Sequence, residues 1–257
     1  MRAVLAAKTK TLSDGDALPQ AQTCVWGSAL ENANDIGLLS PGTVLGHALF
    51  IDTHSWIGWH TRRDRALLAE TGTAVAHCPS PFARYGHVLE NLGAYLADGI
   101  PVGIGTDVSP HNLVEEMRKA AILARIAARD IRAASTSDVL HCATVNGAKA
   151  LLRDDLGRIA VGKKADLVLV DLKEPHMVPA RDPLRSFVYH ATDRAVRDVF
   201  VDGVQVVEAG KVLTMNQADA GRRLAEAQQR MLDHVPAVDY RKRSAEEITP
   251  LSLAVVD

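Results

Sequence analysis

Hydrophobic residues gather in three short runs that recur about every thirty positions, and each run ends in a polar side chain. The runs cover residues 43–47, 74–77 and 102–107 and end at His47, His77 and Asp107. Their short length and the flanking Gly and Pro are typical of buried parallel strands. The spacing matches one strand-plus-helix unit. The pattern therefore predicts an α/β fold that brings these three polar side chains to one edge of a parallel sheet.

Helical periodicity and end signals predict helices between and after these strands. We expect helices over residues 26–39, 64–72, 89–98 and 113–133, and one from a Ser137 cap to residue 152. Further on the pattern changes to short β runs at residues 167–171, 197–201 and 204–207. Asp202-Gly203 joins the last two runs, and this dipeptide between strands predicts a hairpin. A last helix is expected over residues 216–233.

These changes of pattern predict four segments. Residues 1–24 form an irregular N-terminal segment, 25–157 a β/α unit, 158–214 a small antiparallel β element, and 215–257 a C-terminal helix and tail.

Composition and charge narrow the class of protein. Hydrophobic residues make up 47% of the 257 residues, charged residues 23%, and the net charge is −2. These values are ordinary for a soluble globular protein and favour neither nucleic acid nor an anionic membrane as partner. The three cysteines are far apart and form no CxxC pair, and no apolar run approaches the ~20 residues that span a bilayer. We therefore predict a cytoplasmic protein.

Two imidazoles and a carboxylate at neighbouring strand ends suggest a metal-assisted hydrolytic site. A single histidine at a strand end is more often a structural hydrogen-bonding residue. Asp107 is more informative, because an unpaired carboxylate is costly to bury. The three residues together, at the spacing of a β/α barrel, favour a functional role for His47, His77 and Asp107.

The loops after these strands supply further candidates for substrate contact. Trp56 follows the first strand, and an aromatic wall there suits a flat, ring-shaped substrate; the alternative is that Trp56 and Trp59 pack the loop onto the barrel rim. His111 follows Asp107 and is expected to reach substrate. Cys78, next to His77, is interpreted as a buried thiol rather than a nucleophile.

The order of the motifs resembles the amidohydrolase superfamily, and in particular its cytosine deaminase and triazine hydrolase (atrazine chlorohydrolase-like) branch. The motifs are Gly46-His47, residues 75–79, Gly105–Asp107, Glu116–Arg118, residues 143–148 and residues 162–168. The resemblance implies the C-terminal portion, strands 6–8, of a TIM-type β/α barrel, followed by a small β-sandwich element. It also implies hydrolysis of a C–N or C–Cl bond on a small heterocyclic substrate by water activated on a divalent metal, Zn²⁺ or Fe²⁺.

The resemblance also implies a role for each motif residue. His47 matches the histidine that orients the attacking hydroxide and stabilises the tetrahedral intermediate. His77 matches a position that lines the site and contacts substrate. Asp107 matches a metal ligand that also accepts the proton of the water and passes it to the leaving group.

The sequence departs from the family pattern in its metal ligands. It contains no His-x-His pair, and its first twenty residues contain no histidine that would match the fifth-strand ligand. Only Asp107 remains of four expected ligands, and a catalytic zinc needs about three protein ligands. We therefore expect a C-terminal half that is inactive alone and that forms a homo-oligomer or pairs with an N-terminal half.

Two alternatives remain at this point. The first is a non-catalytic remnant that acts as a binding or oligomerisation partner of an intact homologue. The second, a metal site built from His47, His54 and His60, is disfavoured because these residues lack the i, i+4 spacing of a helical metal pair.

Overall fold

Three parallel strands, β1 (Val44–Gly46), β2 (Ala74–His77) and β3 (Val102–Ile104), form a sheet in the order β1-β2-β3. The computed structural model describes residues 27–253, so the expected segment 1–24 lies outside the described residues. Leu45 pairs with Val75, and Val75 pairs with Val102. Both valines are fully buried. The three predicted strands are confirmed, although β3 ends three residues before Asp107.

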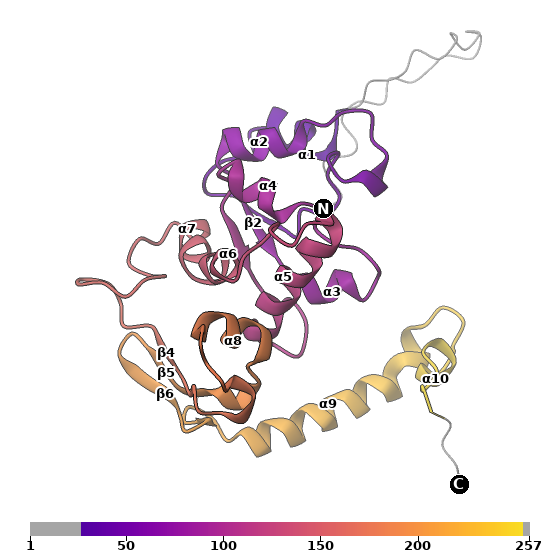
Figure 1. Cartoon of the computed structure of the whole chain (residues 1–257). Helices are drawn as coiled ribbons and strands as arrows, with labels where there is room; N and C mark the ends of the chain where they lie inside the picture. The colour runs from indigo at the N-terminus through magenta and orange to yellow at the C-terminus, as the bar shows by residue number, and fades with distance from the viewer. Residues whose placement is uncertain (1–26, 254–257) are drawn as a thin grey trace, which may run out of the picture.

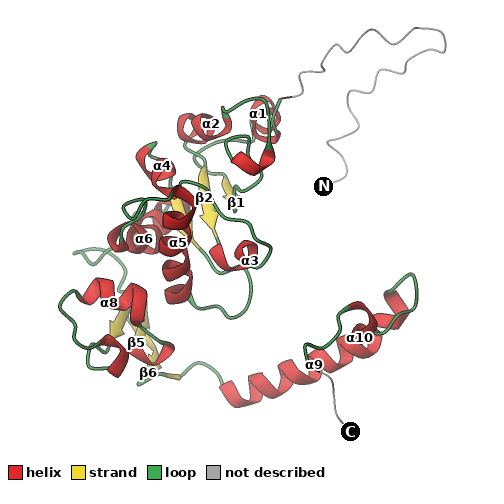
Figure 2. Ribbon diagram, turned by 45° about the vertical axis from the view of Figure 1, so that its right-hand side comes forward, coloured by secondary structure: helices red, strands yellow, loops and turns green. Residues whose placement is uncertain are grey.

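Helices connect and cover these strands (Figures 1 and 2). They are α1 (Ala29–Asp35), η1 (Ser55–Ile57), α2 (Asp64–Thr71), α3 (Pro79–Ala83), α4 (Leu92–Ala97), α5 (Leu113–Ala128), α6 (Thr136–His141), the π-helical turn η2 (Cys142–Asn146) and α7 (Gly147–Ala150). The predicted cap at Ser137 is wrong. Ser135 caps α6 instead, because its hydroxyl accepts a hydrogen bond from Asp138 N at 3.1 Å while the Asp138 carboxylate accepts one from Ser135 N at 2.8 Å.

One hydrophobic core fills the space between this sheet and its helices. The buried face of α5 presents Met117, Ala120, Ala121 and Ala124, as its periodicity predicts. On the other side of the sheet, β3 and α7 approach closely. A Cβ atom on Gly103 would lie 3.3 Å from Gly147 Cα, a tight contact, so the missing side chain at Gly103 allows this close approach.

A second, antiparallel sheet follows in the order β4-β5-β6-β7. Its strands are β4 (Leu167–Val170), β5 (Val196–Val201), β6 (Val204–Glu208) and β7 (Lys211–Val212). The predicted hairpin is confirmed: Asp202 and Gly203 have φ angles of 50° and 80°, which suits a tight two-residue turn. Three helical segments that the sequence did not predict accompany this sheet, η3 (Pro175–Met177), α8 (Pro183–His190) and η4 (Asp193–Ala195).

Helix α8 joins the two parts of the molecule. It packs against α5 and α6, and Arg118 Nε of α5 donates a hydrogen bond to Val188 O at 3.1 Å. A small separate core of Met177, Ala191 and Ala195 lies beside the antiparallel sheet.

The last long helix, α9 (Gln217–Val238), projects away from both sheets and contacts only the short helix α10 (Ala245–Ile248) extensively (Figures 1 and 2). It begins one residue after the predicted start and is capped by Asn216, and it continues five residues past the predicted end. None of its residues is buried. Across residues 27–253, we find no helix long and apolar enough to cross a membrane.

Candidate functional site

His47 follows β1 directly and remains attached to the sheet. Its backbone N–H donates a hydrogen bond to Ala76 O of β2 at 2.8 Å. The ring therefore starts from the carboxyl end of the strand, as predicted. Its Nδ1 atom is buried and has no hydrogen-bond partner in the described residues, whereas Nε2 points toward Asp107.

Asp107 stands beyond the end of β3, and its Oδ2 atom lies 3.8 Å from His47 Nε2. Gly105 N donates to His77 O at 2.9 Å, so the segment before Asp107 is still attached to β2. The side chains of His47 and Asp107 are 25% and 45% exposed, which leaves both accessible to water. The fold thus brings together the two residues that we predicted to be catalytic.

Both residues also have a left-handed backbone, which seven other non-glycine residues among the described ones share. His47 and Asp107 have φ angles of 65° and 58°, in the left-handed region that residues other than glycine seldom adopt. Such conformations cost of the order of 1–3 kcal/mol and cluster at active sites. This conformational signal could not be found in the sequence, since neither position carries glycine.

His77 is the last residue of β2 and is buried. Burial lowers the pKa of His77 to about 3, and the nearby His47 acts in the same direction. The ring is therefore neutral at physiological pH, and its Nδ1 atom has no hydrogen-bond partner among the described residues. A neutral imidazole in this position can line a site and exchange hydrogen bonds with a ligand.

The thiol of Cys78 is unsuited to nucleophilic attack. Burial raises its pKa to about 11, and the carboxylates of Asp107 and Glu116 act in the same direction. A reactive thiol needs a depressed pKa. The structure thus agrees with the interpretation of Cys78 as a buried thiol.

Glu116, which belongs to the motif Glu116–Arg118, has a structural role in the site that we did not predict. Its buried carboxylate accepts hydrogen bonds from Ser80 N at 2.9 Å and from the Ser80 hydroxyl. It thereby fixes the turn after His77 to α5. The sequence did contain an indication of this role. Glu116 lies on the buried face of the predicted helix with Met117 and Ala120, and a buried carboxylate needs a hydrogen-bond partner.

The two remaining predicted residues, His111 and Trp56, lie in the segments that follow β3 and β1 along the chain. His111 is exposed, and its Nδ1 atom lies 2.9 Å from the hydroxyl of Thr106, next to Asp107. Trp56 lies in η1 and stacks on His87, with ring centroids 4.4 Å apart.

The described residues do not fit a catalytic metal site by themselves. In residues 27–253, no group of three or more His, Cys, Asp or Glu side chains is placed to hold a metal ion. His47 and Asp107 offer two donors, fewer than the three protein ligands that a catalytic zinc takes. The alternative set of His47, His54 and His60 is not among such groups within residues 27–253. The buried His54 ring is instead hydrogen-bonded through Nδ1 to Leu49 O at 2.6 Å.

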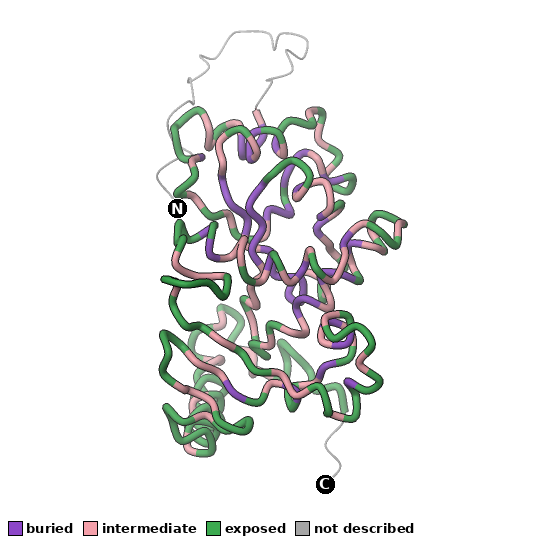
Figure 3. The backbone as a smooth tube through the Cα atoms, turned by 60° about the vertical axis from the view of Figure 1, so that its left-hand side comes forward, coloured by how far each residue is buried: buried purple, intermediate pink, exposed green. Residues whose placement is uncertain are grey.

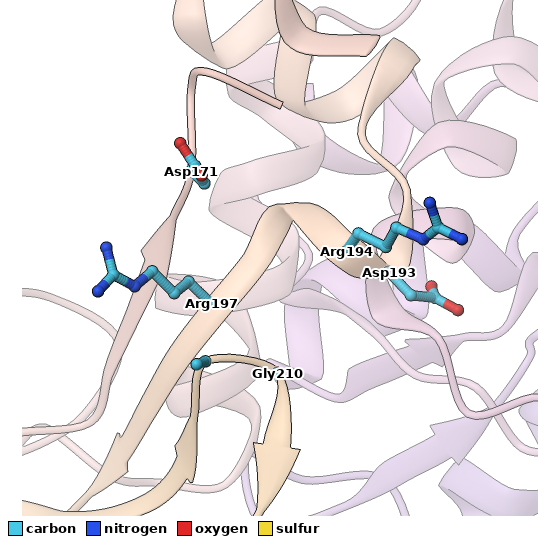
Figure 4. A pocket seen from close by; sticks show the side chains of 6 residues that line it. Asp171, Asp193, Arg194, Arg197 and Gly210 are labelled. Atoms are coloured by element: carbon cyan, nitrogen blue, oxygen red, sulfur yellow. The ribbon is translucent and has the colours of Figure 1, made fainter. Parts of the chain in front are cut away.

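A separate hollow of about 590 Å³ lies on the antiparallel sheet (Figure 4). Its lining residues are Asp171, Asp193, Arg194, Arg197, Ala209 and Gly210. None of the predicted site residues lines it. Its two arginines point in opposite directions, so they do not converge on one ligand.

Comparisons with known proteins identify relatives for most of the chain. It is 35% identical over 201 residues to the 5-methylthioadenosine/S-adenosylhomocysteine deaminase of Natronomonas pharaonis, and 33% identical over 194 residues to the 5'-deoxyadenosine deaminase of Methanosphaera stadtmanae. These matches cover 77% and 74% of this chain but 44% and 43% of the relatives. The chain therefore spans less than half the length of these curated relatives.

Solved structures also match most of this chain but less than half of their own length. An adenosine deaminase from Xanthomonas campestris with bound zinc matches with a TM-score of 0.71 and 29% identity, over 78% of this chain and 45% of that one. The atrazine chlorohydrolase TrzN from Arthrobacter aurescens, complexed with zinc, matches with a TM-score of 0.65 and 27% identity, over 76% and 42%. The sequence profile of the Amidohydrolase family matches residues 21–206. The chain belongs to the amidohydrolase family.

Proposed function

We propose that this chain supplies one side of the active site of a hydrolytic deaminase that acts on an amino-substituted heterocycle of the adenine nucleoside type. The observation that carries the proposal is the water-accessible pair of His47 and Asp107, 3.8 Å apart and both in left-handed conformations. The adenine nucleoside class is taken from the deaminases that the chain resembles. In this reaction water adds to the ring carbon that carries the amino group, ammonia leaves, and the carbon becomes a carbonyl.

The geometry suggests how the residues divide the work. The Asp107 carboxylate accepts a proton from the attacking water and delivers it to the departing amino group. His47 Nε2 lies 3.8 Å from Asp107 Oδ2 and hydrogen-bonds to the oxygen of the tetrahedral addition product. His77, which is neutral, lines the site, while Trp56 and His111 contact the substrate from the loops.

The metal requirement leads to a proposal about partners. Relatives of known structure contain zinc, and Asp107 is the one residue here that matches a ligand of the family. We propose that the further ligands come from a separate N-terminal half, since another copy of the chain would again offer only Asp107, and that this polypeptide is inactive alone. Asp107 and the ligands of the other polypeptide would then hold the divalent ion, zinc or iron, together.

We also propose a place for the chain in the larger fold. In this proposal β1, β2 and β3 correspond to strands 6–8 of a TIM-type barrel within residues 25–157. Residues 158–214 form the β-sandwich element, and residues 215–257 form the C-terminal helix and tail. The outer edges of β1 and β3 have no strand partner in the described residues, which supports the pairing of this sheet with further strands.

Ammonia release tests the proposed function. The chain is assayed with 5'-deoxyadenosine, 5'-methylthioadenosine and adenosine, alone and co-expressed with the N-terminal half of the Natronomonas pharaonis deaminase, in the presence of Zn²⁺. We expect activity only in the co-expressed sample. Chloride release from a chlorotriazine, measured in parallel, tests dechlorination as the alternative reaction.

Variants connect this activity to the site. Asp107→Asn is expected to lower the rate at least ~100-fold, because it removes the proton-transferring carboxylate. Asp154→Asn, at an exposed position, serves as the matched control and should keep full activity. Equal rates for the wild type and Asp107→Asn would disprove the assignment.

A non-catalytic role is the second candidate. It is favoured by the lack of a metal-binding cluster within residues 27–253. In that case the chain would bind an intact homologue without adding activity, which co-purification and the ammonia assay together would reveal.

A further inference from the structure

Three aromatic side chains extend from His47 along the loops of the site. Phe82 of α3 lies next to the His47 ring, with centroids 4.5 Å apart and the planes tilted by 60°. Phe50 lies 6.1 Å from Phe82, and Trp56 lies 5.2 Å from Phe50, both in edge-to-face arrangements. We refer to Phe50, Trp56 and Phe82 as the aromatic wall. It connects the predicted catalytic histidine to the predicted substrate-binding tryptophan.

The outer part of the wall is open to solvent. Phe50 is 61% exposed and Trp56 is 37% exposed, whereas Tyr95, which packs behind the same loop, is 1% exposed. Burying a large aromatic ring is favourable, because it removes apolar surface from water. Exposed rings that are grouped beside a candidate catalytic residue therefore indicate a surface that a ligand covers.

The loop that carries Trp56 is fixed at both ends by buried carboxylates. Asp52 accepts hydrogen bonds from Arg63 N at 2.7 Å and Asp64 N at 3.0 Å, and Asp64 accepts one from Asp52 N at 2.8 Å. Near the tip of the loop, Ser55 N donates to the carboxylate of Glu90 at 2.8 Å. The loop is thus closed by hydrogen bonds between backbone N–H groups and side-chain carboxylates.

The inner end of the wall is fixed in the same way. The buried contact of Glu116 with Ser80 N holds the start of α3, two residues from Phe82. The rings are therefore held in place before any ligand arrives. Such preorganisation lowers the entropy lost on binding.

We propose that the aromatic wall is the subsite that binds the planar ring system of the substrate by stacking, and that Phe50 and Phe82 are specificity-determining residues for flat heterocycles. This inference rests on the proposed function and assigns its substrate-ring subsite. Phe50 offers the open ring surface, while Phe82 holds the bound ring at the edge of His47. Stacking of a base on an aromatic side chain typically changes affinity by about 5- to 150-fold when the side chain is replaced by alanine.

Equilibrium dialysis of the full chain against inosine tests the inference. Inosine has a purine ring without the amino group, so its binding is independent of ammonia release. We expect Phe50→Ala to weaken binding at least about fivefold and Phe50→Trp to keep it within about twofold. Tyr240→Ala is the matched control, because Tyr240 is also a highly exposed aromatic residue, and it should bind inosine like the wild type.

Three results would overturn the inference. The first is the same inosine affinity in Phe50→Ala and the wild type. The second is no binding by the wild type at millimolar inosine. The third is a loss of self-association in Phe50→Ala, seen by sedimentation, with inosine binding unchanged, which would mean that a polypeptide covers the wall.

The same measurements distinguish failure of the subsite from failure of the proposed deaminase function. Phe50-dependent inosine binding without ammonia release under any condition would retain the subsite and reject the deaminase. Ammonia release with the same KM in the wild type and Phe50→Ala would retain the deaminase and reject the subsite.

Discussion

The parallel α/β part and the antiparallel sheet with its projecting helix differ sharply in how their residues are buried. Strand β2 is almost entirely buried, whereas β4 and β6 contain no buried residue. Figure 3 shows the same contrast along the backbone, with buried segments concentrated around the parallel sheet. The α/β part has a large continuous core, and the antiparallel sheet has a core of three buried residues. The candidate site thus lies on the part of the molecule that is packed well enough to hold it rigidly.

The topology explains this difference. A central parallel strand has a neighbour on each side and helices on its faces, so its side chains are enclosed. An antiparallel sheet can leave one face in water, and Val168 and Val204 are exposed for this reason. The same kind of substitution should therefore change the free energy of unfolding much more in the α/β part than in the antiparallel sheet.

Truncating a buried leucine should give the largest effect. Leu68 of α2 is fully buried, and Leu68→Ala is expected to lower the free energy of unfolding by about 2–5 kcal/mol, because it removes buried surface and leaves a cavity. Val204→Ala on the exposed hairpin should change it by about 0.5 kcal/mol or less. Urea denaturation of both variants measures the comparison, and equal losses would contradict it.

Acid should weaken the α/β part through His77. Its pKa is about 3 in the folded protein against an ordinary value of 6.5, so the unfolded chain takes up the proton first as the pH falls. Stability is therefore fully present above pH 6.5 and decreases toward pH 3, by up to roughly 1.4 kcal/mol per pH unit. His77→Asn should flatten this dependence in urea titrations between about pH 7 and 4.

A measurement at about pH 8 provides the control for this prediction. There His77 is neutral in both states, so the difference between the wild type and His77→Asn reports only the packing change. An unchanged slope in the variant across the acid range would show that His77 does not cause the acid sensitivity.

The smallest effect is expected in α9. Leu224 and Met231 are 72% and 71% exposed, and nothing in the described residues buries them. Leu224→Ala should change the free energy of unfolding by no more than about 0.5 kcal/mol. Thermal denaturation at two protein concentrations measures this, and a loss above about 1 kcal/mol that grows with concentration would indicate that a second copy covers the helix.

Local patterns predicted much of the fold. The three parallel strands, α2 with its Gly72 stop, α5 and the Asp202-Gly203 hairpin all followed from periodicity and end signals. The five-residue helix α3 is too short to show a period, whereas α8 was missed although Asp182 caps it and Pro183 begins it. The Ser137 error has a similar cause, since Ser135 and Ser137 are both good caps and only the reciprocal bond with Asp138 decides between them.

For the candidate site, the sequence predicted which residues lie at the strand ends. The sequence by itself determined that His77 ends its strand and that His47 and Asp107 follow neighbouring strands, because strand period and parallel connection are local properties of the chain. Tertiary structure alone decided the 3.8 Å separation of His47 and Asp107, their left-handed backbones and the neutral state of His77. It also decided the row of aromatic rings from His47 to Trp56. These properties depend on which distant residues surround a side chain and exclude water from it, and a linear pattern contains no information about such neighbours.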